Sequence, residues 1–183
     1  MQNIKKISVF CGSSTGNDAE FLQACHQLAA LFVSHKTSLV YGGGNIGLMG
    51  ILADEVLRLG GEVIGIIPQK LVDIEVAHTG LSRLFIVSSM HQRKAKMMEL
   101  SDAFIIMPGG IGTLDEFFDV FTWKQLGYHN KPVSILNIKQ FFDPLISYLN
   151  DLVGHGFVKQ SIMDTLIIGD TPGVLMEELF DSL

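Results

Sequence analysis

Two acidic residues follow a glycine-rich turn in the run PGGIGTLDE, residues 108–116. The short apolar run before this turn predicts a strand, and the helical spacing of apolar residues after it predicts a helix. Glycine lets a ligand approach the backbone closely, and the first N–H groups of a helix attract an anion. The turn therefore predicts a phosphate site, with the carboxylates of Asp115 and Glu116 beside it.

Glu116 also has a structural interpretation. Thr113 and Glu116 have the spacing of a capping box, in which Thr113 caps the helix and Glu116 accepts the N–H of the cap residue. On spacing alone the cap is favoured. A catalytic carboxylate needs support from elsewhere in the chain.

Positive charge could reach the same place from the run MHQRKAKM, residues 90–97. This segment follows a predicted strand, so its first turn should open at the same edge of the sheet. Arg93 can hold a phosphate through two donors, whereas Lys94 acts as a point charge. The alternative is that both side chains lie on a solvated helix face.

Composition narrows the classes of function. The chain has 183 residues and a formal charge of −6 without a basic cluster, which argues against a nucleic-acid surface. Few apolar residues follow the N-terminus, so we expect no signal peptide and no membrane span. Two cysteines suit a cytoplasmic protein, and six scattered histidines predict no metal site.

Apolar runs alternate with helical patterns along the whole chain. Strands are expected at residues 4–10, 38–41, 63–67, 84–87, 103–107, 132–136 and 166–168. Helices are expected at about residues 17–33, 47–60, 90–100, 113–126, 140–153 and from 171 onward, the first of them opened by a capping box of Asn17 and Glu20. This order predicts an α/β fold, a Rossmann-like doubly wound parallel sheet with helices on both faces. Residues 1–183 then form a single nucleotide-binding domain.

Three glycine-rich stretches fall after predicted strands, at residues 12–14, 42–47 and 109–112. The ligand crevice of such a sheet lies beyond the carboxyl ends of its strands, so the three stretches should converge there. Gly42, Gly44 and Gly47 also match a dinucleotide fingerprint. The acidic residue that this fingerprint needs about 20 positions later is missing from the end of the next strand, so we discount a dinucleotide site and expect no cofactor.

A phosphate turn, a cation and a carboxylate together suit cleavage at the anomeric carbon of a nucleotide. Loss of a base from a ribose passes through an oxocarbenium-like state. A carboxylate can stabilise that cation or activate the attacking water. Glu75, in the long predicted loop 69–82, could help to bind the ribose or place the water.

Two separated signatures resemble one known family. PGGIGTLDE at 108–116 and MHQRK at 90–94 resemble the paired motifs of the LONELY GUY family, the cytokinin-activating nucleoside 5′-monophosphate phosphoribohydrolases. The resemblance covers nearly the whole chain. Further matching segments are CGSS at 11–14, YGGG at 41–44, GLMG at 47–50, VIGIIP at 63–68, TW at 122–123, QLG at 125–127 and KPV at 131–133.

The resemblance implies roles for individual residues. Arg93 and Glu116 would be the catalytic pair. Substrate binding would fall to Glu75, Lys94, Gly110, Gly112, Thr113 and Thr122, and the neighbouring crevice positions Gly12, Ser13, Gly43, Met90 and Gly109 are further candidates. The implied reaction is hydrolysis of an N6-substituted adenosine 5′-monophosphate to the free base and ribose 5-phosphate, in a homodimer and without a cofactor.

Two departures from the plant pattern bear on the substrate. Ile111 replaces a tyrosine, which affects preference for a decorated base if position 111 lines the base pocket, and Asp115 replaces a glutamate. Two alternatives stay open: a nucleosidase for AMP with no hormone role, and a module that binds or carries a nucleotide without cleaving it. A carboxylate beside an anion favours the enzyme, because a pure phosphate binder gains nothing from it.

Overall fold

The computed structural model describes residues 4–72 and 77–182. Its strands are β1 (Lys6–Phe10), β2 (Ser38–Tyr41), β3 (Val63–Pro68), β4 (Arg83–Val87), β5 (Ala103–Ile106), β6 (Val133–Leu136) and β7 (Leu166–Gly169). Its helices are α1 (Ala19–Ser34), α2 (Gly47–Arg58), α3 (Gln69–Val72), α4 (Met90–Leu100), α5 (Ile111–Gln125), the 3-10 turn η1 (Ile138–Gln140), α6 (Asp143–Gly154), α7 (Gln160–Met163) and α8 (Pro172–Asp181).

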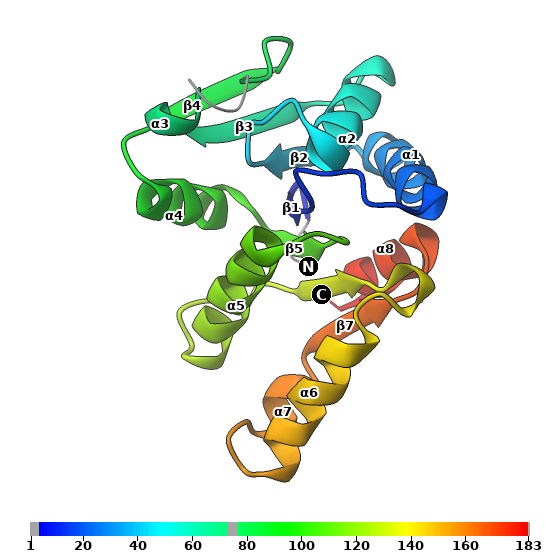
Figure 1. The fold of residues 1–183 in the computed structure, drawn as a ribbon, viewed down its shortest axis with the longest axis vertical. Coiled ribbons are helices and arrows are strands. Elements are labelled where there is room, and N and C mark those ends of the chain that lie inside the picture. Colours follow the sequence, from blue (N-terminus) through cyan, green and yellow to red (C-terminus); the bar gives the residue numbers. More distant parts are fainter. Residues whose placement is uncertain (1–3, 73–76, 183) are drawn as a thin grey trace.

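The strands form one parallel sheet in the order β4-β3-β2-β1-β5-β6-β7. From the central neighbours β1 and β5, successive strands follow outward in chain order, β2 to β4 towards one edge of the sheet and β6 and β7 towards the other. This reversal is a topological switch point, where the connections leave towards opposite sides. The predicted doubly wound α/β fold is confirmed, and the chain can be followed through the sheet in Figure 1.

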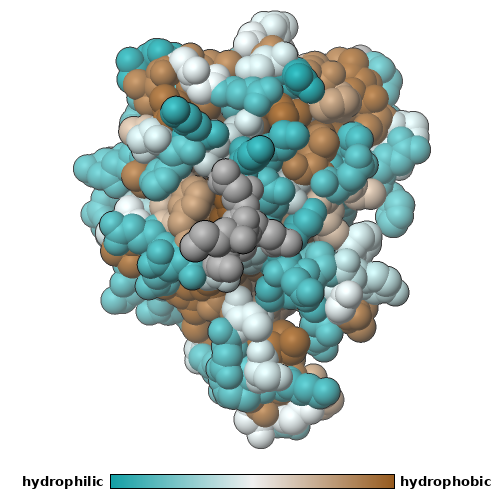
Figure 2. All heavy atoms as spheres, turned by 180° about the vertical axis from the view of Figure 1, so that it is seen from behind, coloured by the Kyte–Doolittle hydropathy of each residue, from teal (hydrophilic) through white to brown (hydrophobic). Residues whose placement is uncertain are grey.

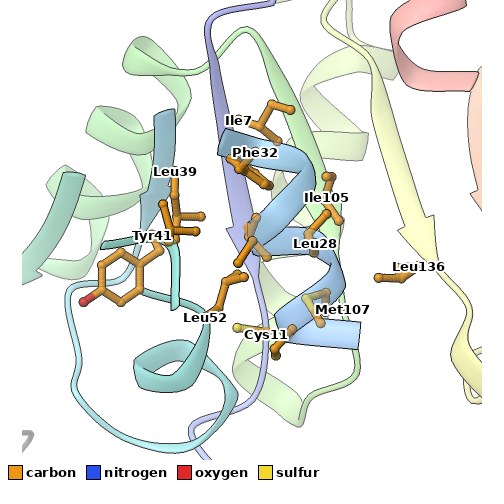
Figure 3. Packing of buried hydrophobic residues seen from close by; sticks show 14 of the residues in the cluster. Ile7, Cys11, Leu28, Phe32, Leu39, Tyr41, Leu52, Ile105, Met107 and Leu136 are labelled. Atoms are coloured by element: carbon orange, nitrogen blue, oxygen red, sulfur yellow. The ribbon is translucent and has the colours of Figure 1, made fainter. Parts of the chain in front are cut away.

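Two apolar cores cover the two faces of the sheet. One packs α1, α2 and α8 against the sheet, and the other packs α4, α5, α6 and α7 against its opposite face. Side chains alternate between them along a strand: in β5, Ile105 faces the first core while Phe104 and Ile106 face the second. Figure 3 shows the first core, where Leu28 and Phe32 of α1 lie over the sheet. Burial on both faces explains why the strands read as continuous apolar runs.

The local predictions were less accurate than the overall one. Helix α1 begins one residue later than a cap at Asn17 would allow, because Asp18 is the cap and accepts the N–H of Glu20 at 3.0 Å. The predicted capping box there was wrong. The loop 69–82 contains the short helix α3, and the helix expected from 140 begins at Asp143, after a 3-10 turn.

The face opposite to that of Figure 1 carries hydrophilic residues interspersed with brown apolar areas, which stand out near the top of the view (Figure 2). Among the residues that the structure describes, no helix combines the length and apolar character needed to cross a bilayer.

Candidate active site

The loops after β1 and β5 meet at the switch point. Gly12 N–H donates to the carbonyl of Pro108 at 3.1 Å. A Cβ on Gly109 would lie 2.9 Å from the Gly12 nitrogen and would overlap Thr113 Oγ1. The two loops can therefore touch only because glycine stands at this contact, and the predicted convergence of Gly12 and Gly109 is observed.

Helix α5 begins at this contact with Gly110 as its cap residue, and no side chain in the described part of the chain caps it. The first N–H groups of a helix have no acceptor within it, so those of Ile111, Gly112 and Thr113 are available to an anion. A Cβ on Gly110 or Gly112 would meet nothing within 4 Å, so the helix start is open. This geometry suits the predicted phosphate position.

The start of α5 also excludes the structural interpretation of Glu116. Thr113 lies inside the helix, so it is not the cap and the predicted capping box does not form. Glu116 instead faces Arg93 of α4, with 3.6 Å between Glu116 Oε1 and Arg93 Nη2. The side chain of Arg93 is buried, at 9% exposure, and that of Glu116 is nearly so, at 11%.

Gly42 gives Arg93 its position. A Cβ on Gly42 would overlap Nη2 of Arg93, so the guanidinium lies directly against the backbone that follows β2. Arg93 Nη1 lies 3.8 Å from the sulfur of Met90. Nothing within the described residues accepts a hydrogen bond from the buried Nε of Arg93. The guanidinium thus has hydrogen-bonding capacity to spare for a ligand.

Burial raises the pKa of Glu116 to about 7, against the attraction of Arg93 and Lys94, which lowers it. Asp115 and Asp119 add to the rise. A carboxyl group that titrates near neutral pH can exchange protons with water or substrate at working pH, which general acid–base catalysis requires.

Lys94 does not point its charge into the cleft as we expected. Its Nζ lies 2.6 Å from both Asp115 Oδ2 and Asp119 Oδ2, which are a turn apart on α5. Burial lowers the pKa of Lys94, but hydrogen bonds to Asp115 and Asp119 outweigh this and raise it. Lys94 therefore ties α4 to α5 as a permanent cation beside the Arg93–Glu116 pair.

A cleft of about 190 Å³ joins these parts. Its lining includes seven predicted residues: Gly12, Ser13, Arg93, Gly110, Gly112, Thr113 and Glu116. Ile111, at the position we expected to affect the base, also lines it, as do Cys11 and Met49, which we did not predict. Cys11 ends the first apolar run and Met49 lies in the first turn of α2, and both positions read as core from sequence.

The other predicted residues lie around this cleft. Met90 contacts Arg93, and Gly109 lines an adjoining cavity. Gly43 has a positive φ of 78° and accepts the N–H of His78 at 3.1 Å. Thr122 is exposed on α5, about 9 Å along the helix axis from Glu116. Glu75 lies outside the described residues.

The first N–H groups of α2 are not free for a dinucleotide. Leu48 N–H donates to Ser14 O and Met49 N–H to Gly12 O, each at 3.4 Å. A Cβ on Gly47 would overlap the backbone of Ser13. Gly47 therefore serves close packing of α2 against the loop after β1, which argues against a dinucleotide at the start of α2.

Fold and site together define a Rossmann-like α/β protein with a candidate phosphate-binding helix start and a buried arginine–glutamate pair at its switch point. A family model described as "Possible lysine decarboxylase" matches residues 49–179. A "Cytokinin riboside 5'-monophosphate phosphoribohydrolase" from Rhodococcoides fascians is 44% identical over 165 residues, which cover 90% of this chain and 83% of the relative. The chain belongs to this family, the LONELY GUY (LOG) family.

A second relative has a similar description, and a solved structure has the same fold. "Cytokinin riboside 5'-monophosphate phosphoribohydrolase LOG1" of Arabidopsis thaliana is 42% identical over 177 residues, 97% of this chain and 83% of that protein. Among solved structures, the Moco carrier protein from Chlamydomonas reinhardtii superposes with a TM-score of 0.72 at 16% identity, covering 98% of this chain and 99% of that one. At this identity the superposition shows a common fold and nothing more.

Proposed function

We propose that this protein hydrolyses the N-glycosidic bond of adenosine 5′-monophosphates, including N6-substituted ones, to the free base and ribose 5-phosphate. The observation that carries the proposal is the buried Arg93–Glu116 pair in the same cleft as the uncapped start of α5. The names of the relatives from Rhodococcoides fascians and Arabidopsis thaliana support it.

In this mechanism the substrate phosphate binds the N–H groups at the start of α5, and Thr113 and Gly112 line its position. The ribose then lies over Glu116. As the bond between C1′ and the base nitrogen breaks, its electron pair leaves with the base, which takes up a proton from solvent water; the proton that Glu116 gains is later returned to solvent. The Glu116 carboxylate stabilises the positive charge on the ribose and accepts a proton from the water that attacks C1′.

Arg93 has two roles in this mechanism, one towards Glu116 and one towards the substrate. Its charge lowers the pKa of Glu116, which increases the fraction of carboxylate at neutral pH. Its buried guanidinium also presents donors to the substrate's hydroxyl or phosphate oxygens. Gly43, Met90, Lys94, Thr122 and Glu75 remain candidate substrate-binding residues by resemblance to the family.

The description of the family model suggests another reaction, decarboxylation of lysine. Such chemistry commonly uses a lysine amine that forms a Schiff base, which requires a lowered pKa. Lys94, the lysine beside this cleft, has a raised pKa and is held by Asp115 and Asp119. The charge state of Lys94 therefore favours the phosphoribohydrolase.

We further propose that the protein acts as a homodimer in the cytoplasm, on a small nucleotide and without nucleic acid, metal or cofactor. Helices α4 and α5 expose apolar side chains that a second copy could cover, with Met90 43%, Ile111 82% and Phe118 40% exposed. Both cysteines are free and buried, which suits a reducing compartment.

The test is to identify the products. The protein is incubated with AMP and with N6-isopentenyl-AMP, and the mixtures are resolved by chromatography. We expect free base and ribose 5-phosphate in equal amounts, and the ratio of the two rates will give the preference between AMP and its N6-substituted form. Adenosine and inorganic phosphate would instead indicate a phosphatase. Calorimetric binding of nucleotide without any product would favour the non-catalytic binding module.

A further inference from the structure

Helices α4 and α5 are joined by charged side chains at two neighbouring places. Arg93 of α4 meets Glu116 of α5, with 3.6 Å between Nη2 and Oε1. The next residue of α4, Lys94, has its Nζ 2.6 Å from both Asp115 Oδ2 and Asp119 Oδ2 of α5. We call these last three side chains the Lys94 bridge. The bridge therefore lies directly beside the pair to which we assign the chemistry.

The two acids of the Lys94 bridge need the lysine between them. Asp115 and Asp119 are four residues apart on α5, a spacing at which like charges destabilise a helix. Lys94 compensates for this repulsion, and its side chain is only 22% exposed, against 54% for Asp115 and 39% for Asp119. Charge-assisted hydrogen bonds that are partly shielded from water are stronger than ion pairs at an open surface. The bridge is therefore more than a surface ion pair.

Apolar packing does not fill the space between the two helices beside the Lys94 bridge. A hollow of about 100 Å³ lies there, and its lining consists of His91, Lys94, Ala95, Met98, Asp119 and Trp123. Because packing leaves this gap, the charged contacts of the bridge supply the connection between α4 and α5 at this point.

Asp119 lies next to Glu116 as well as to Lys94, because residues three apart on a helix are neighbours on its surface. The charged and titratable groups that act on Glu116 are Arg93 and Lys94 of α4, Asp115 and Asp119 of α5, and Cys11 after β1. Burial has the largest effect on the pKa of Glu116 and raises it, Lys94 lowers it, and Asp119 raises it. Asp119 and Lys94 thus act on the carboxyl group with opposite signs.

We propose that Asp119 is a positioning residue of this site: it holds Lys94 so that α4 keeps the distance at which Arg93 meets Glu116, and it balances the charge of Lys94 beside that carboxyl group. The inference rests on the proposed hydrolase function. Asp119 lines the hollow between the helices rather than the cleft, so it acts through Lys94 and Glu116 and not on the substrate.

Loss of the Asp119 charge has two expected consequences. Lys94 loses one of its two acceptors, so the contact between Arg93 and Glu116 is held less firmly. The charge of Lys94 is also less balanced, which stabilises the Glu116 carboxylate and makes it a weaker base. Both effects lower activity, but only the second one moves the pH profile.

The test compares Asp119→Asn with Glu99→Gln. Each variant removes one carboxylate from an ion pair with a lysine, but Glu99 pairs with Lys96 inside α4, at 2.9 Å, and does not connect the helices. In Asp119→Asn the plateau of kcat/KM for N6-isopentenyl-AMP should fall about tenfold, and the acid limb should move down by about 0.5–1 pH unit. Glu99→Gln should match wild type in both, and Asp119→Glu, which keeps the charge, should restore the limb.

A double-mutant cycle tests whether Asp119 acts through Lys94. In a Lys94→Met background, Asp119→Asn should change kcat/KM by less than about twofold, because the charge that Asp119 holds is already gone. A tenfold loss in that background would overturn the inference. So would an acid limb that stays in place in Asp119→Asn, since that result would reduce Asp119 to a structural contact.

Carbon NMR of protein labelled in its glutamate carboxyl groups follows Glu116 without turnover, with Glu116→Gln to identify its signal. The midpoint of this titration should also move down by about 0.5–1 pH unit in Asp119→Asn. If wild type releases no base but the midpoint moves, the hydrolase proposal fails while the action of Asp119 on Glu116 stands. If base is released and neither the limb nor the midpoint moves, the hydrolase proposal stands and this inference fails.

Discussion

Replacement of Glu116 by glutamine should stabilise the folded protein at alkaline pH while it removes the catalytic carboxylate. Burial raises the pKa of Glu116 from 4.5 to about 7, so ionising this group in the folded state is unfavourable. The difference of about 2.5 pH units corresponds to about 3 kcal/mol, at about 1.4 kcal/mol per unit. Glutamine resembles the protonated carboxyl group and avoids this cost.

The sign of the pH dependence follows from the raised pKa. Below 4.5 the group is protonated in both the folded and the unfolded state, and it does not oppose folding. Between 4.5 and about 7 the unfolded chain releases the proton while the folded one retains it, so stability falls as pH rises. Glu116→Gln should therefore match wild type near about pH 4 and exceed it by about 3 kcal/mol at about pH 8.

Urea unfolding followed by circular dichroism at these two pH values measures the difference. Glu177→Gln on α8 is the control, since this exposed acid should change stability by less than about 0.5 kcal/mol at either pH. A loss of about 3–5 kcal/mol in Glu116→Gln at the higher pH would refute the reasoning. That result would mean that attraction to Arg93 outweighs burial.

Two further predictions concern the same pair. The kcat/KM of wild type should fall as pH drops below about 7, because Glu116 takes up a proton. Arg93→Gln removes a cation that lowers the pKa of Glu116, so it should move this acid limb of the pH profile to higher pH. An acid limb that does not move would disprove the coupling between Arg93 and Glu116. Gly42→Ala should reduce kcat/KM by about 100-fold with little loss of stability, because the new methyl group displaces only the end of the long Arg93 side chain. Gly173→Ala, where a Cβ meets nothing, is the matched control, and retained activity in Gly42→Ala would show that Arg93 need not lie there.

The sheet and its crevice could be predicted because their signals are local in sequence. Continuous apolar runs such as β5 reflect burial on both faces, and the glycines after β1 and β5 reflect the contact of two loops. That Arg93 would come near the phosphate turn also followed from position, since α4 and α5 each follow a strand and open at one edge of the sheet. Its pairing with Glu116 was implied by the resemblance to the family.

Other features depend on contacts that sequence spacing does not contain. The cap of α5 was predicted at Thr113, but the loop contact of Gly109 starts the helix at Ile111. Lys94 was expected at the phosphate, but it neighbours two acids on α5 that attract it. Phe141 reads as one apolar residue of a helix face, but it lies before α6, after two residues with positive φ, and lines the cavity that Gly109 also lines.

The most direct test of the central claim is single-turnover release of base from N6-isopentenyl-AMP by wild type, Glu116→Gln and Arg93→Gln, each first shown to bind the nucleotide by calorimetry. If the pair performs the chemistry, wild type releases the base with an equal amount of ribose 5-phosphate, and both variants slow this step by at least about 100-fold. Release at the wild-type rate from a variant that binds nucleotide would contradict the claim.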